Sequence, residues 1–504
     1  MIGEDIVSFS KQQIFIILIS SALFFCARKK LRNRLFMNYT TKKNLLSFFF
    51  VFAELVLSVN SIFSRTKFSI HKNILMNQNL TTGKKNYTSE IVIIGILFFI
   101  FGFVTWLNST LIPYLQIACQ LETSQAVLVT FAFYISYAVM AFPSSWVLKK
   151  TGFKNGMMWG LILMAIGALI FIPAAQTRTY GLFLTGLFVI GTGLALLQTA
   201  SNPYITILGP IESAAKRISV MGICNKGAGA LAPLIMGAFL LKNSDAIVEK
   251  LKTLNPAEKA VELDALASRV IVPYIIIAAV LVALAVFIYF SSLPEVKAEG
   301  EDVEKNTTNG DGQTIFSFPY LWIGFVTLFL YVGVEVMAGD IIQVYGKAIG
   351  ISLDIAKHFT TYTMIGMLIG YLIGIVTIPK YMSQTTALKG SAILGVIFTL
   401  LAIFTSGYTS VLFIALLGLA NALVWPAIWP LTIHGLGRFT KAGSALLIIG
   451  IAGGAVLPKI WASLGEKIGF QQAFWIMIPC YLFILYFAAY GHKAGTKAAI
   501  RKAA

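Results

Sequence analysis

Three ionisable side chains lie far from the ends of the long apolar segments that dominate this sequence: Lys226, Glu335 and Asp340. A charged group inside a membrane is costly, so each one is a functional candidate. Glu335 sits near the middle of its segment, where poor hydration suits a carboxyl group that alternates between protonated and cation-bound forms. We therefore predict that Glu335 couples to a moving cation. A structural carboxylate paired permanently with Lys226 is the alternative.

The other two ionisable residues have less specific expectations. Asp340 lies about 140° around an ideal helix from Glu335 and nearer the end of its segment, which predicts a solvated position at the rim. Lys226 is expected either to extend toward the membrane surface or to pair with an acid across the molecule. It is kept as a possible charge partner for Glu335.

Amides and indoles recur at helical spacing. Two sets occur, Gln198 with Asn202, and Asn421 with Trp425 and Trp429. Residues four apart share one face of a helix, and sugars are bound by amides that donate and accept and by aromatic faces. The alternative assigns the indoles to the membrane interface and the amides to helix packing. Trp106, near the middle of its segment, disfavours a purely interfacial role, so a sugar site is predicted.

Positioning these residues requires a framework inside a membrane. Of the 504 residues, 57% are apolar and 12% charged, about half the usual charged share of a soluble protein. Only helices satisfy their own backbone groups in lipid, and barrel strands are about half as long as these segments. The predicted fold is an all-α membrane protein with twelve transmembrane helices, at 91–117, 126–148, 156–175, 180–208, 219–241, 272–291, 320–345, 356–379, 390–406, 410–433, 442–465 and 471–490.

The twelve predicted helices fall into two groups. Residues 91–291 and 318–491 are expected to form two six-helix bundles. The acidic, Gly- and Asn-rich stretch 292–317 has no apolar periodicity and is predicted to be a cytoplasmic linker. Residues 492–504 form a basic C-terminal tail.

Two further segments stand apart. Residues 1–90 form a basic N-terminal extension that breaks the charge pattern of the rest, so Met76 is the predicted functional start; an interfacial or additional membrane anchor is the alternative. The long break 242–269 carries apolar residues at helical spacing among charges and is predicted to be a surface helix at the membrane interface.

Lys and Arg residues of the short loops gather on one side of the predicted bundle. That side includes Lys149, Lys150, Lys154, Lys380, Lys389, Arg438 and Lys493. Positive loops face the cytoplasm, so both ends of the twelve-helix unit are predicted to lie inside a cell inner membrane.

The two groups of helices carry an internal repeat. A constant offset of 223 pairs Gln198 with Asn421 and Asn202 with Trp425, and Pro203 then falls on Pro426. Both prolines are expected to kink their helices at the site. Parallel repeats of this kind allow alternating access around a site near the midplane.

Several motifs together resemble a known family. They are Phe101-Gly-Phe-Val-Thr-Trp-Leu-Asn108, Leu197-Gln-Thr-Ala-Ser-Asn-Pro-Tyr204, Gly222-Ile-Cys-Asn-Lys226, Trp425-Pro-Ala-Ile-Trp-Pro430 and Gly435-Leu-Gly-Arg438. From about residue 91 to 490 the chain resembles the fucose permease branch of the major facilitator superfamily, and within it is most similar to bacterial glucose/galactose transporters. The resemblance implies a sugar importer driven by H⁺ or Na⁺.

One departure from that branch concerns proton binding. Its pattern has a carboxylate after Leu-Asn in helix one and another before Thr-Ala in helix four. Ser109 and Gln198 stand there in this sequence, and neither binds and releases a proton, so that role does not carry over. The resemblance retains Asn225 as the sugar-binding amide of helix five, and Asn108 joins it.

Other functional classes are disfavoured by the sequence. It has no Gly-rich phosphate loop with Lys-Ser/Thr and no His-Glu-x-x-His motif, and its four cysteines lack paired spacing. No enzyme activity, metal, cofactor or nucleic-acid partner is expected. The prediction is a monomeric hexose symporter for glucose or galactose; the alternatives are an L-fucose-type 6-deoxyhexose symporter, an uncoupled facilitator and, across classes, a channel or membrane enzyme. The predicted substrate-binding residues are Trp106, Asn108, Gln198, Asn202, Asn225, Asn421, Trp425 and Trp429.

Overall fold

A computed structural model describes residues 88–207, 214–291, 293, 314–378, 380–436 and 439–495. All regular structure within these ranges is helical. The predictions for Met76 and for almost all of 1–90 lie outside the described residues. So do most of the linker 292–317 and the end of the tail 492–504.

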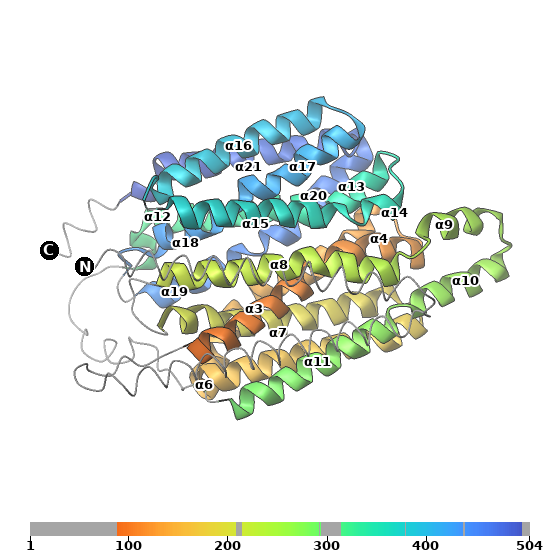
Figure 1. The fold of residues 1–504 in the computed structure, drawn as a ribbon, viewed down its shortest axis with the longest axis horizontal. Coiled ribbons are helices and arrows are strands. Elements are labelled where there is room, and N and C mark those ends of the chain that lie inside the picture. Colours follow the sequence, from red (N-terminus) through yellow and green to blue (C-terminus); the bar gives the residue numbers. More distant parts are fainter. Residues whose placement is uncertain are drawn as a thin grey trace, which may run out of the picture. The chain divides into compact units, whose positions relative to one another are not determined.

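The N-terminal half, residues 88–291, consists of long helices and their connections (Figure 1). Its helices are α3 Thr88–Trp106, α4 Asn108–Ala118, α5 Thr123–Ala126, α6 Leu128–Gln176, α7 Tyr180–Ile207, α8 Ala214–Leu240, α9 Ser244–Thr253, α10 Pro256–Ser268 and α11 Ile271–Phe290. Gly152 has φ 76° inside α6, a conformation open to glycine because it lacks a Cβ. The long α6 therefore contains two of the predicted helices, 126–148 and 156–175, joined at Gly152.

The C-terminal half, residues 314–495, is also helical. Its elements are η2 Ile315–Ser317, α12 Pro319–Gly339, α13 Ile342–Ala348, α14 Leu353–Ala356, α15 Phe359–Thr377, α16 Gln384–Phe404, α17 Gly407–Asn421, α18 Val424–Ile433, α19 Thr440–Gly450, α20 Gly453–Ile468, η4 Gln472–Ile476, α21 Met477–Ala489 and η5 Gly491–Lys493. α8 packs against α15 of this half, and α6 packs against α19 and α20. We call the contact between the two halves the seam.

The described chain is built to cross a membrane many times. Eleven of its helical stretches are long and apolar enough to do so. One of them, Thr123–Gln176, spans 54 residues and reverses at Gly152, so it holds two of the twelve predicted spans. Large apolar side chains such as Phe142 and Phe404 are exposed on the outer surface, where lipid replaces water. The predicted all-α multi-pass membrane fold is confirmed.

Several of these spans are interrupted. α3 ends at Trp106 and α4 begins at Asn108; α12 ends at Gly339 and α13 begins at Ile342; α17 ends at Asn421 and α18 begins at Val424. Interrupted helices free backbone groups that membrane transporters use to line binding sites. The breaks in this chain lie beside several of the predicted site residues.

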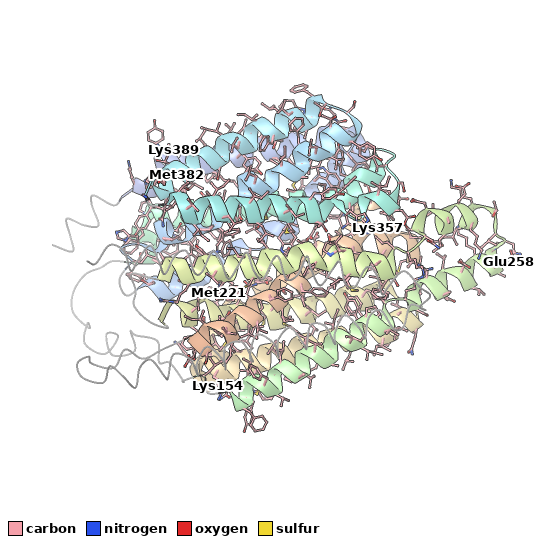
Figure 2. All side chains as sticks on the ribbon, viewed as in Figure 1. Lys154, Met221, Glu258, Lys357, Met382 and Lys389 are labelled. Carbon is pink, nitrogen blue, oxygen red and sulfur yellow. The ribbon has the colours of Figure 1, made fainter. Side chains whose placement is uncertain are left out.

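The long helices present two ends. Lys154 and Lys389 lie toward one end, and Lys357 and Glu258 toward the other (Figure 2). We call them the Lys154 end and the Lys357 end. This agrees with the predicted separation of the lysines, and the side of the membrane that each end faces stays a prediction.

The break at 242–269 forms two helices, α9 and α10, rather than one surface helix. Pro256 begins α10, and the Asn255 side chain accepts a 2.9 Å hydrogen bond from the Glu258 backbone N–H. Proline fits the first turn of a helix but cannot continue a preceding one. The single-helix expectation is wrong for this reason, and the placement at the membrane interface stays a prediction.

Candidate functional site

A buried ion pair joins the two halves. Lys226 Nζ, on α8, donates to Glu335 Oε1, on α12, at 2.7 Å. The two side chains are only 10% and 11% exposed. Lys226 thus pairs with an acid across the seam and does not extend to the membrane surface. Removing either charge alone would strand the other in a place that water scarcely reaches.

Trp106 covers this ion pair. Lys226 Nζ lies 4.5 Å from the centroid of the indole ring, within the range of a cation–π interaction. A Cβ on Gly229 would lie 2.5 Å from the indole, and one on Gly339 would lie 2.1 Å from it. The indole therefore fits between α8 and α12 only because both positions are glycine. Its Nε1 has no hydrogen-bond partner among the described residues.

An aromatic row leads from α18 toward the ion pair. The rings of Trp425 and Trp429 stack at 5.5 Å, with 24° between their planes. Tyr331 lies 6.4 Å from Trp425, centroid to centroid, and it precedes Glu335 by one helical turn on α12. The predicted indoles are thus connected through Tyr331 to the predicted coupling residue.

Asn421 is the last residue of α17, and a short break separates it from Trp425 and Trp429 of α18. It is fully buried, its Oδ1 accepts from the Tyr481 hydroxyl at 3.0 Å, and its backbone oxygen accepts from the Tyr331 hydroxyl at 3.3 Å. Ala422 and Leu423 form the break, and both have right-handed helical backbone angles. Tyr331 contacts both Asn421 and Trp425, and the placement of Asn421 on one face with the two indoles stays a prediction.

The predicted sugar-binding amides of the N-terminal half contact different partners. Gln198 Nε2 donates to the Tyr137 hydroxyl at 3.0 Å, and Asn225 Nδ2 makes a long, 3.4 Å contact with the Phe98 carbonyl. Asn202 is half-buried on α7, and Asn108 is buried with Nδ2 unpartnered among the described residues. The hydrogen bonds of Gln198 and Asn225 are made within the N-terminal half and do not involve the ion pair.

Asp340 is the largest correction to the sequence-based expectations. It is 0% exposed at the end of α12, so the predicted solvated rim position is wrong. The expectation assumed a helix continuing through residue 345, whereas α12 stops at Gly339. Asp340 Oδ2 accepts a long, 3.4 Å hydrogen bond from the Tyr134 hydroxyl of α6. Its Oδ1 has no partner in the described part of the chain.

A polar network closes the end of α12. Gln343 Nε2 donates to the hydroxyls of Ser109, at 3.2 Å, and Thr360, at 3.0 Å. Thr360 Oγ1 in turn donates to the Gly339 carbonyl at 2.7 Å, and Thr363 Oγ1 donates to the Ala338 carbonyl at 2.9 Å. The carbonyls that a helix leaves free at its C-terminus are thereby satisfied by α15. Ser109 brings the N-terminal half into this network.

Sequence reasoning missed Tyr331, Tyr134, Gln343 and Thr360. Two of them had a usable signal. Tyr331 is four residues before Glu335, and Gln343 is three after Asp340, so each lies one turn from an intramembrane acid. Tyr134 and Thr360 come from distant segments, and only the tertiary packing shows that they belong here.

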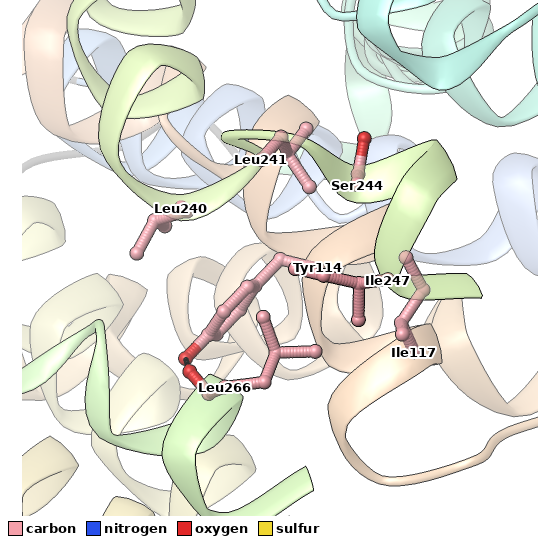
Figure 3. Close-up of a pocket in the computed structure, with 7 residues that line it drawn as sticks. All are labelled: Tyr114, Ile117, Leu240, Leu241, Ser244, Ile247 and Leu266. Carbon is pink, nitrogen blue, oxygen red and sulfur yellow. Dashed lines mark hydrogen bonds between the residues drawn. The ribbon is translucent and has the colours of Figure 1, made fainter. Parts of the chain in front are cut away.

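A separate apolar pocket lies toward the Lys357 end, between α4, α10 and the junction of α8 with α9 (Figure 3). Its lining residues are Tyr114, Ile117, Leu240, Leu241, Ser244, Ile247 and Leu266. The Tyr114 hydroxyl donates to the backbone carbonyls of Leu266 and Ala267, at 2.8 Å each. The pocket contains none of the predicted site residues and lacks the amides that a sugar needs.

Comparisons with known proteins agree on one family. Residues 94–458 match the Major Facilitator Superfamily. The glucose/galactose transporter of Brucella abortus biovar 1 is 33% identical over 417 residues, covering 82% of this chain and 97% of the relative. The L-fucose-proton symporter of Escherichia coli is 27% identical over 420 residues, covering 82% and 95%.

A solved structure gives the same result. The transporter FucP in its outward conformation superposes with a TM-score of 0.63 at 27% sequence identity, covering 81% of this chain and 99% of that chain. The all-helical fold, the interrupted spans and the extent of these matches lead to one conclusion. The chain belongs to the Major Facilitator Superfamily.

Proposed function

We propose that this protein is a secondary active transporter that imports a hexose, glucose or galactose first, together with H⁺ or Na⁺. The relatives named glucose/galactose transporter and L-fucose-proton symporter support a sugar substrate. The observation that carries the coupling is the buried Lys226–Glu335 pair, because it links the two halves at the seam. We further propose a monomer in the inner membrane with both ends of the helical unit in the cytoplasm and no cofactor besides the moving cation.

Glu335 is the proposed coupling residue. Alternating access separates the halves, and separation pulls Lys226 away from Glu335. A buried carboxylate without a partner is costly, so a cation bound at Glu335 would take the place of the ammonium group. Lys226 is then the competing charge that holds the seam closed when no cation is bound.

The proposed sugar site lies beside this pair. Trp106 and the stacked pair Trp425 and Trp429 would cover the apolar faces of the sugar. The amides would bind its hydroxyl groups, because each of them can donate and accept. The amides assigned to this role are Asn108, Gln198, Asn202, Asn225 and Asn421.

Transport by purified protein in proteoliposomes tests the proposal. Labelled glucose should exchange for unlabelled glucose without any gradient, whereas an enzyme would convert it and a channel would not show counterflow. Glu335→Gln should reduce gradient-driven accumulation at least tenfold while exchange continues, because exchange needs no net cation movement.

A matched control is available on the surface. Glu249 pairs with Lys252 at the same 2.7 Å, but the two side chains are 71% and 65% exposed. Glu249→Gln should leave accumulation at the wild-type level, since exposed pairs contribute little. Accumulation that survives in Glu335→Gln would refute the coupling role. Repeating the assay with and without sodium at fixed pH identifies the cation.

An uncoupled facilitator or a 6-deoxyhexose symporter is the second candidate. Ser109 and Gln198 occupy the positions where the fucose permease pattern has carboxylates, and this favours different coupling from that branch. Competition of labelled glucose uptake by L-fucose separates the sugars. Failure of every imposed ion gradient to drive accumulation in the wild-type protein would establish the facilitator.

A further inference from the structure

We infer that Asp340 is the binding site for the proton that moves with the sugar. The inference rests on the proposed symport and commits it to H⁺. Asp340 ends α12 in the C-terminal half, and Tyr134 of α6 reaches it from the N-terminal half. Ser109 of α4 also lies beside the carboxyl group. The acid is therefore enclosed by both halves at the seam.

The surroundings of the Asp340 carboxyl group disfavour its charged form. It is 0% exposed, Oδ1 has no side-chain partner among the described residues, Oδ2 accepts a 3.4 Å hydrogen bond from Tyr134, and the Ser109 backbone N–H is the other donor beside it. An ionised carboxylate buried with so few partners is costly, so the neutral acid is favoured in this conformation. Its position at the C-terminal end of α12 adds to this, since that end of a helix carries a partial negative charge.

The charged and titratable groups that face Asp340 come from three helices. They are Tyr134 on α6, Glu335 on α12 and Lys226 on α8. The carboxylate of Glu335 disfavours a second negative charge nearby. Lys226 would favour one, but its ammonium group is engaged by Glu335 at 2.7 Å. While the halves are together, the Lys226 ammonium group thus stays with Glu335, and Asp340 is neutralised by a proton.

Two acceptors around Asp340 have no donor, while two buried donors of the N-terminal half, Trp106 Nε1 and Asn108 Nδ2, have no acceptor among the described residues. Gln343 donates its amide to Ser109 and Thr360, while its Oε1 has no partner in the described ranges. Asp340 Oδ1 is a second unpartnered acceptor in the same region. A proton on Asp340 supplies a donor where two buried acceptors have none, and buried acceptors without donors destabilise a fold.

Access to this proton is tied to the movement of the halves. Tyr134, Trp106 and Ser109 belong to the N-terminal half, so separation at the seam removes them from the end of α12. Water then reaches the carboxyl group and hydrates its charged form, so the proton leaves. The movement that separates Lys226 from Glu335 also releases the proton from Asp340, and this proton is the cation that Glu335 then binds in place of the ammonium group.

Sugar-induced alkalinisation of the medium outside proteoliposomes tests the inference, alongside glucose counterflow in the same preparation. Wild-type protein should alkalinise the medium as glucose enters. Asp340→Asn should lower this signal at least tenfold, and its counterflow should no longer depend on pH. Asp340→Glu keeps an acid and should retain the signal with a shifted pH midpoint. Ser109→Asp combined with Asp340→Asn places an acid beside the same site from α4 and should restore part of the signal.

Each failure has its own meaning. Alkalinisation that persists in Asp340→Asn overturns the inference. Alkalinisation that is lost in Asp340→Asn, in Asp340→Glu and in the combination of Ser109→Asp with Asp340→Asn also overturns it. Wild-type accumulation driven by sodium without alkalinisation overturns the proton site and leaves the symport intact. Absence of glucose counterflow in the wild-type protein refutes the proposed function itself.

Discussion

Lys226 and Glu335 are 109 residues apart in the chain, yet their side chains meet at 2.7 Å in a nearly dry environment. Burying both charges costs hydration that their attraction only partly returns. Such a pair is a weak source of stability, but it is sensitive to anything that changes one partner. That sensitivity suits a residue whose partner is exchanged during a transport cycle.

A variant that removes only the lysine should be less stable than the wild-type protein. Lys226→Gln leaves Glu335 buried without a cation, and breaking a buried pair costs roughly 3–5 kcal/mol. The thermal midpoint of the detergent-purified protein should therefore fall below that of the wild-type protein.

The double variant completes this comparison. Lys226→Gln with Glu335→Gln has no stranded charge, so its thermal midpoint should recover toward the wild-type value. A double variant less stable than Lys226→Gln alone would show that Glu335 needs no cationic partner.

Sequence predicted some of these residues better than others. Glu335 and Lys226 could be found because a charge inside an apolar segment is a local signal. Their mutual contact was only one of several options, because helix packing decides it. Asp340 was placed at a rim by ideal helix geometry, and the break after Gly339 invalidated that geometry.

At the scale of the helices, small residues set the close contacts. Gly453 of α20 lies so near α12 that a Cβ there would meet the Phe329 carbonyl oxygen at 1.7 Å. Gly102 of α3 is equally tight, with Asn225 O at 1.9 Å from the position of a Cβ. Close backbone approach between membrane helices depends on such residues. Two glycines of α8 allow a direct comparison, because a Cβ would clash at one of them and meet open space at the other.

Gly229→Ala and Gly227→Ala should differ sharply. A Cβ on Gly229 would lie 2.5 Å from the Trp106 indole, whereas one on Gly227 meets nothing within 4 Å. Gly229→Ala should displace Trp106 from Lys226 and lower glucose exchange at least tenfold, while Gly227→Ala should stay within about twofold of wild type. Equal activity of the two variants in proteoliposome exchange would show that the wedged position of Trp106 is unimportant.

Span positions were predictable because length and apolarity are local properties of the chain. The interruptions were not. The end of α12 is stabilised by hydroxyls of Thr360 and Thr363 from α15, and nothing in the sequence around Gly339 shows those donors. The same applies to α9 and α10, where Pro256 was the available signal for two helices rather than one.

At the scale of the whole transporter, polar contacts join the halves at the Lys357 end. The Asp245 carboxylate, from α9, accepts hydrogen bonds from the Ser352 hydroxyl and from the backbone N–H groups of Leu353 and Asp354, the last two at 3.1 Å. It thereby caps α14 of the opposite half. Burial lowers the pKa of Lys347 nearby, and the Asp245 carboxylate acts on it in the opposite direction.

Other contacts reinforce the same end. Lys459 Nζ donates to the Ser124 carbonyl at 2.7 Å, and the Ser124 backbone N–H donates to Glu466 Oε1 at 2.8 Å. Lys347 Nζ donates to Gln116 Oε1 at 3.2 Å. These bonds favour the conformation in which the Lys357 end is closed, and their loss shifts the population toward an open one.

Asp245→Ala should produce that shift. Loss of a capping carboxylate costs about 1 kcal/mol, which changes a two-state ratio about fivefold. A cysteine placed at Thr361, which donates to the Ala230 carbonyl across the seam, should react about fivefold faster with an impermeant maleimide. Asp264→Ala is the control, because Asp264 pairs with Arg178 within one half. Unchanged labelling in Asp245→Ala would show that the cap does not hold this end closed.

The packing of Trp106 against a lysine also has an optical consequence. Indole emission depends on nearby charge and on contact with water, and Trp106 is buried with an ammonium group over its ring. Any rearrangement that separates the halves changes both surroundings at once. Of the eight tryptophans in the chain, Trp106 is therefore one whose emission should change if the halves separate, without any attached dye.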